Sequence, residues 1–150
     1  MISTRNLPSR ARARQGPAVG TGERVYLAAP KAEYHSPRYG RLAALTRTLF
    51  PDAAIIEART AFLDTGDWRA NWPKVLASIS TLVFLTTPDG WIGRGVWAEI
   101  QDAHARVPVY LLTDLGQLVP HADVIFSRPN SENWTQHVRV TARTGGSNAA

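Results

Sequence analysis

The sequence has no cysteine, which excludes disulfide bonds and thiolate metal sites. Its four histidines lack the close pairing of a histidine metal site, so we expect neither a bound metal nor a cofactor. No apolar stretch approaches the ~20 residues of a membrane span, and the N-terminal segment lacks the apolar part of a secretory signal. These absences predict a cytoplasmic protein that does not enter a membrane.

The positive charge of the chain is concentrated at its beginning. The formal net charge is +5, and residues 1–23 hold four arginines and one glutamate, so that this segment carries +3 and the rest +2. A basic segment with several proline, glycine and serine residues predicts a disordered tail. Such a tail can contact nucleic-acid phosphates, but we favour a solvated segment and do not expect a nucleic acid as partner. Residues 144–150 are also expected to be disordered.

Strands and helices alternate over residues 24–143. Apolar runs predict five strands, at 24–30, 53–57, 81–86, 107–112 and 124–126. Amphipathic patterns predict helices at about 38–49, 71–80 and 93–106, an irregular segment at 58–70, and a last helix or irregular segment at about 131–141. Strands that are apolar along their whole length and alternate with helices are typical of a parallel sheet covered on both faces. We expect a single α/β domain of about five strands.

Glu99 stands out in the segment that follows the third predicted strand. A loop with three glycines leads there into an amphipathic helix whose core stripe is Val96, Ile100 and Ala103. Glu99 lies roughly 60° from Val96 around the helix axis, at the border of this stripe. Because open α/β sheets bind ligands beyond the carboxyl ends of their strands, we hypothesise that Glu99 faces a ligand. The alternative is an exposed glutamate near the positive end of the helix dipole.

Five segments of the chain carry a resemblance to a known family. They are residues 25–30, a strand that ends in Glu57, and residues 82–85, 93–99 and 107–110. In this order they resemble the nucleoside 2-deoxyribosyltransferase superfamily, which includes nucleotide N-glycosidases. The resemblance implies a flavodoxin-like, doubly wound sheet and a homo-oligomer. It also implies cleavage or transfer at the N-glycosidic bond of a nucleoside or nucleoside 5′-phosphate.

The resemblance also implies roles for individual residues. Glu99 matches the glutamate that forms a covalent glycosyl intermediate, and Tyr26 matches a tyrosine that orients this glutamate. Gly93 and Gly95 match small residues that leave room for the sugar or its phosphate.

One position departs from the family pattern. An aspartate that helps to protonate the leaving base is expected at the register of Pro73, beside Trp72, and neither of these side chains is an acid. Asp89, Asp67 and Asp64 are the candidate substitutes; the alternative is that the acid is absent altogether. Asp89 directly follows the third strand, where the alternative is a Pro-Asp-Gly turn.

Further candidates bind the substrate. The glycine-rich loop and Arg94 would hold a phosphate, or else form a tight loop with a solvated arginine. Trp91 is the candidate wall for a stacked base. Glu57 would bond a ribose hydroxyl or, alternatively, pair with Arg59 or Arg24. Pro30, which ends the first strand, is expected at the same edge of the sheet.

Three functions follow from these patterns. We favour an enzyme that uses Glu99 to cleave the N-glycosidic bond of a small-molecule nucleoside or nucleotide. The alternative is a catalytically inactive nucleotide-binding or sensor domain of the same fold, which the missing aspartate favours. A third possibility is a partner-binding protein that uses its tryptophans as an interface.

Overall fold

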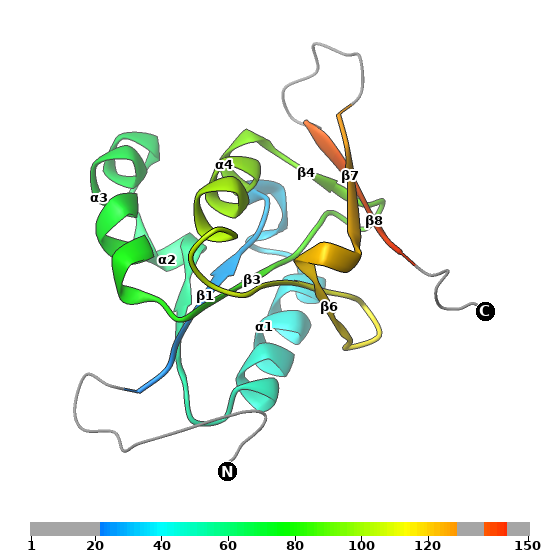
Figure 1. The fold of residues 1–150 in the computed structure, drawn as a ribbon, viewed down its shortest axis with the longest axis horizontal. Helices are drawn as coiled ribbons and strands as arrows, with labels where there is room; N and C mark the ends of the chain where they lie inside the picture. The colour runs from blue at the N-terminus through cyan, green and yellow to red at the C-terminus, as the bar shows by residue number, and fades with distance from the viewer. Residues whose placement is uncertain (1–21, 129–136, 144–150) are drawn as a thin grey trace.

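The structure of the protein is a computed structural model that describes residues 22–128 and 137–143. Its centre is a five-stranded sheet with the strand order β2-β1-β3-β5-β6 (Figure 1). Four strands pair in parallel, namely β1 (Arg24–Ala28), β2 (Ala54–Glu57), β3 (Thr81–Phe84) and β5 (Val109–Leu112). The α/β class with about five strands is therefore confirmed, and the order of the parallel strands is consistent with a flavodoxin-like fold.

The fifth strand of this sheet is not the one that the sequence predicts. β6 (Leu118–Pro120) follows β5 through a tight turn and pairs antiparallel to it. Gly116 in this turn has a φ of 85°, a left-handed conformation that glycine adopts readily. The prediction of a wholly parallel sheet is wrong at this edge, because so short a turn can return the chain only as an antiparallel neighbour.

Helices cover both faces of the main sheet. Figure 1 shows α1 (Pro37–Leu49) on one side of the sheet and α3 (Thr65–Ser78) and α4 (Arg94–Ala103) on the other. Two short 3₁₀ turns, η1 (Lys31–Glu33) and η2 (His121–Asp123), lie in the connections. None of the helices within the described ranges is long and apolar enough to span a membrane.

The central strand β1 shows why the strands are apolar throughout. Val25 and Leu27 belong to the core cluster that includes residues of α1, whereas Tyr26 and Ala28 belong to the cluster that includes residues of α3 and α4. Successive side chains of a strand point to opposite faces, and both faces are covered here. A hydroxyl-bearing side chain, that of Tyr26, is thereby fixed in the layer that contains α3 and α4.

α3 begins at Thr65 rather than near Asn71. Asp64 is its N-cap, and the carboxylate of Asp64 accepts a hydrogen bond from the backbone N–H of Asp67 at 2.8 Å. The short helix α2 (Ala58–Ala61) precedes it, so the prediction of an irregular segment over residues 58–70 is wrong. The aspartate cap decides the start of α3, and Pro73 lies inside the helix.

A second, antiparallel sheet lies beside α4. Its strand order is β4-β8-β7, with bounds Trp91–Ile92, Val138–Ala142 and Val124–Ser127. The strand predicted at residues 124–126 is thus present but belongs to this second sheet. The prediction of a helix or irregular segment at about 131–141 is wrong where the structure describes it, because residues 138–142 form β8. Residues 131–136 lie outside the described ranges, as do residues 1–21 and 144–150 of the predicted tails.

We expect Leu82→Ala to lower the free energy of unfolding by about 2–5 kcal/mol, because it leaves a cavity between packed layers. Leu82 lies in β3 and is fully buried, whereas Leu115 is 87% exposed. Leu115→Ala, the matched control, should change the free energy of unfolding by no more than ~0.5 kcal/mol. Urea unfolding of both variants is the measurement, and equal effects would contradict the packing described here.

Candidate active site

A cavity of about 960 Å³ opens at the carboxyl ends of the parallel strands. Its lining comes from the segments that follow β1 and β2, from the first turns of α3 and α4, and from Thr87 and His137. This edge of the sheet is where open α/β folds bind their ligands. Within the described parts of the chain, no group of three histidine, aspartate or glutamate side chains gathers to hold a metal ion.

Glu99 lines this cavity and is almost fully buried, with 4% of its surface exposed. One of its carboxylate oxygens, Oε2, accepts two hydrogen bonds: one from the hydroxyl of Tyr26 at 2.5 Å and one from the indole N–H of Trp68 at 2.8 Å. No side chain that the structure describes donates to the other oxygen, Oε1. The predicted core stripe of α4 is confirmed, since Val96 and Ile100 are buried, and the alternative of an exposed Glu99 is wrong.

Burial sets the charge state of this carboxylate. It raises the pKa of Glu99 to about 7, and the hydrogen bonds from Tyr26 and Trp68 limit the rise because they favour the charged form. The negative charge of Asp102 adds to the rise. The pKa of the Tyr26 hydroxyl is also raised, chiefly by burial and then by Glu99. Tyr26 therefore stays protonated and donates, while Glu99 becomes ionised as the pH rises through about 7.

Trp72 contacts both Tyr26 and Asp102. Its indole N–H donates to Oδ2 of Asp102 at 3.0 Å, which links α3 to α4. The rings of Trp72 and Tyr26 pack at an angle of 50°, with their centroids 5.0 Å apart. The register at which the family resemblance expects an acid is therefore occupied by a buried tryptophan and by Pro73.

Four of the residues predicted to bind the substrate lie around the cavity. Pro30, Gly93, Arg94 and Gly95 all line it. A Cβ atom added at Gly95 would meet no other atom within 4 Å, so the space beside this first turn of α4 is open. The structure thus brings Glu99, Tyr26 and these four residues to one region of the molecule.

Asp89 and Trp91 lie elsewhere. Asp89 is exposed, and its carboxylate accepts a hydrogen bond from the hydroxyl of Thr87 at 2.6 Å within a turn. Gly90 in this turn has a φ of 91°, so the Pro-Asp-Gly alternative describes the segment correctly. Trp91 belongs to β4, where the guanidinium of Arg139 lies 5.6 Å from the centre of its ring. Neither residue is part of the cavity lining.

Glu57 is also not among the residues that line the cavity. Its carboxylate accepts a hydrogen bond from the hydroxyl of Tyr39 at 2.7 Å and forms ion pairs with Arg47 and Arg59. The alternative of a salt bridge with Arg59 is thus the one that the structure shows. Glu57 ties β2 to α1 and to the start of α2.

The main residue that the sequence did not single out for a role is Trp68. Its position four residues before Trp72 places both indoles on one face of α3, toward the layer that contains Glu99. The N-cap pattern at Asp64 is the signal that reveals this, because it starts the helix early enough to include Trp68. Tyr34, Phe62 and Lys31 also line the cavity without having been predicted to.

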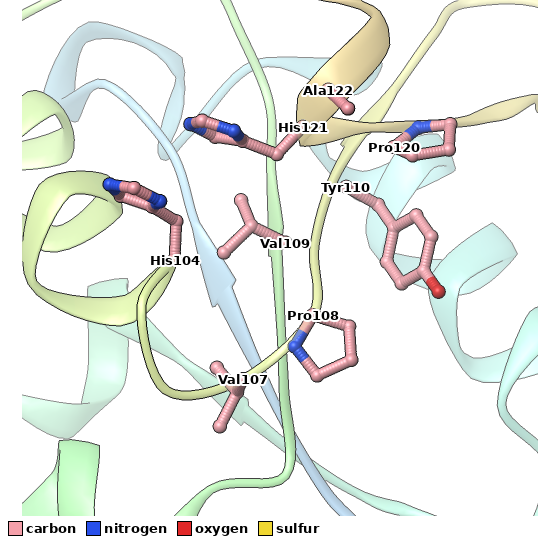
Figure 2. Close-up of a pocket in the computed structure, with 8 residues that line it drawn as sticks. All are labelled: His104, Val107, Pro108, Val109, Tyr110, Pro120, His121 and Ala122. Carbon is pink, nitrogen blue, oxygen red and sulfur yellow. The ribbon is translucent and has the colours of Figure 1, made fainter.

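A second, smaller hollow of about 270 Å³ lies at the other end of α4 (Figure 2). The imidazole rings of His104 and His121 stack along one side, with their centroids 4.5 Å apart and their planes within 2°. The pKa of His121 is lowered by burial and by the neighbouring charge of His104. This hollow is at the amino end of β5, away from the edge where Glu99 lies.

No protein-family model, curated protein or solved structure matches this chain. The candidate active site is therefore assigned from its own geometry.

We expect Glu99→Gln to stabilise the protein at alkaline pH. The folded state holds a proton on Glu99 up to about pH 7, whereas an unfolded glutamate loses its proton near 4.5, so wild-type stability falls as the pH rises between these values. The ionised carboxylate costs about 3 kcal/mol at pH 8, and the amide removes this cost. Urea unfolding at pH 5 and pH 8 measures the effect.

Glu23→Gln, at an exposed position, is the control and should keep the wild-type fall in stability between pH 5 and pH 8. An unchanged pH dependence in Glu99→Gln would mean that Glu99 does not titrate as a buried group.

Proposed function

We propose that the protein cleaves or transfers at the N-glycosidic bond of a nucleoside or nucleoside 5′-phosphate, with Glu99 as the nucleophile. One observation carries this proposal: a buried carboxylate lines a nucleotide-sized cavity and is held through a single oxygen by two donors from different elements. Ligand pockets of this kind are commonly 300–1,000 Å³ in volume.

The chemistry of the bond explains the need for such a carboxylate. N-glycosidic cleavage passes through a sugar with positive charge at C1′ and its ring oxygen, which a nearby carboxylate stabilises or captures. Tyr26 and Trp68 occupy Oε2, so we assign the attack on C1′ to Oε1. The bond between C1′ and the base breaks, and the base leaves with the electron pair. Water or a second base then attacks C1′ and frees Glu99.

The lining of the cavity supports a place for each part of the substrate. Backbone N–H groups at the start of α4, together with Arg94, suit a 5′-phosphate beside Gly93 and Gly95. Pro30 closes the side formed by the segment after β1. The family resemblance further leads us to propose a doubly wound, flavodoxin-like domain that assembles as a homo-oligomer. The helices on both faces of the sheet support the fold, whereas the homo-oligomer rests on the resemblance alone.

We expect Glu99→Gln to abolish release of free base, with a loss of at least about 10³-fold in rate, because the amide cannot act as the nucleophile. Chromatography of a panel of nucleosides and nucleotides after incubation with purified protein is the measurement. Asp89→Asn, outside the cavity, is the control and should retain the wild-type rate. Binding of a nucleotide without any product would favour the inactive, nucleotide-binding alternative.

We expect the rate of base release, as kcat/KM, to rise with pH and to level off above about pH 7, because only the ionised Glu99 attacks. Tyr26→Phe removes a hydrogen bond that favours the charged form, so the midpoint of the rise should shift to higher pH. A midpoint near 4.5 in the wild type, or the same midpoint in both proteins, would contradict the charge state assigned here.

A further inference from the structure

The function proposed above requires a base to depart from C1′. The charge on the ring nitrogen that leaves C1′ decides whether the base needs a proton. A neutral base leaves as an anion unless a group nearby gives it a proton, and such general acids speed reactions by roughly 10²–10⁴-fold. A base that is already a cation leaves as a neutral molecule and needs no proton. The groups that line the cavity therefore bear on which class of base the site accepts.

Among the described residues that line the cavity, the carboxyl groups belong to Glu99 and Asp64. Glu99 is assigned as the nucleophile. Asp64 is exposed, and its Oδ1 is engaged as the hydrogen-bond acceptor that caps α3. Its carboxylate thus serves the helix end as an acceptor.

Two of the other described polar side chains in the lining have a shifted pKa, and a third donates a hydrogen bond. Burial raises the pKa of Tyr34 to about 12, which makes its phenol a weaker acid than an ordinary tyrosine. The pKa of His137 is lowered by burial and by the charges of Arg128 and Arg94, so its imidazole is neutral at pH 7. Lys31 donates to the hydroxyl of Thr65 at 3.3 Å.

The same lining suits a flat cation. The aromatic side chains of Trp68, Phe62 and Tyr34 line the cavity together with the buried carboxylate of Glu99. Aromatic faces attract cations, and the attraction grows when water is excluded. Four cationic side chains also line the cavity: Arg59 is paired with Glu57, whereas Lys31, Arg69 and Arg94 are at exposed positions.

On the basis of the proposed function, we propose that the substrate is a nucleotide whose base already carries a positive charge, such as a pyridinium or an N-alkylated purinium. Oε1 of Glu99 forms a bond to C1′ while the bond from C1′ to the ring nitrogen breaks. The electron pair of that bond passes to the nitrogen, which loses its positive charge, and the base departs neutral. Water then attacks C1′, restores the carboxylate and releases one proton to the solvent.

Two matched pairs of nucleotides test this substrate class. The first is 7-methylguanosine 5′-monophosphate and guanosine 5′-monophosphate, which share sugar and phosphate and differ in the charge of the base. The second is nicotinamide mononucleotide and its reduced form, which is neutral. For each pair, kcat with the wild-type protein is compared with the spontaneous rate of base release in buffer.

We expect the ratio of kcat values within each pair to lie within about tenfold of the ratio of the spontaneous rates, because we assign no described side chain of the lining to protonate the neutral base. We also expect the pH profile with the cationic nucleotides to have a rising limb and no falling limb. Tyr34→Phe keeps the aromatic face and should leave the ratio within each pair unchanged.

The proposal is overturned if kcat for the neutral partner is raised so that the ratio narrows by about 10²–10⁴-fold, the range a general acid provides, or if a falling limb appears. In that case the proposed N-glycosidic function still stands, with an acid to be found. Release of base from none of the four nucleotides, nor from the wider panel, would overturn the proposed function itself.

Discussion

Burial of the Glu99 carboxylate is the constraint on which the site depends. Removing a carboxylate from water is costly unless hydrogen bonds replace its hydration. Here Tyr26 of β1 and Trp68 of α3 each donate one hydrogen bond to Oε2. These bonds link β1 and α3 to α4 at the carboxyl ends of the parallel strands. The replacement is incomplete, as the elevated pKa of about 7 shows. A carboxylate held in this way has one oxygen fixed by two donors, while the other oxygen has no described side-chain donor.

The register of the sheet decides whether this arrangement can form. Tyr26 lies opposite Leu82 of β3 and Ile56 of β2, and alternation along β1 directs it toward α3 and α4. A shift of one residue would turn Tyr26 toward α1 and remove its hydrogen bond to Glu99. Trp72 then fixes the tyrosine ring from the other side through its contact and through its bond to Asp102. The packing of the core thus also sets the geometry of the site.

A pattern within one segment of the sequence predicts the structural features that depend on interactions within that segment. The spacing of Val96 and Ile100 is enough to orient α4 and to place Glu99 at the edge of its buried face. Trp91, in contrast, was predicted to stack a base, but it pairs in β4 with Arg139 of β8, a strand far along the chain. Such pairing over a long distance leaves no trace in the segment around Trp91. Trp68 was missed for a different reason, since its role requires the early start of α3 at Thr65.

Charge coupling links the nucleophile to the class of base proposed for the site. At neutral pH Glu99 is close to its midpoint of ionisation, so a large share of the free protein carries it in the protonated form, which the proposed attack on C1′ cannot use. A positive ring bound beside it favours the charged carboxylate and lowers its pKa, whereas a neutral base does neither. Binding of a cationic base would therefore ionise the nucleophile at the moment when it is needed. In the proposed reaction, the charge that lets the base depart without a proton would also favour the ionised form of Glu99.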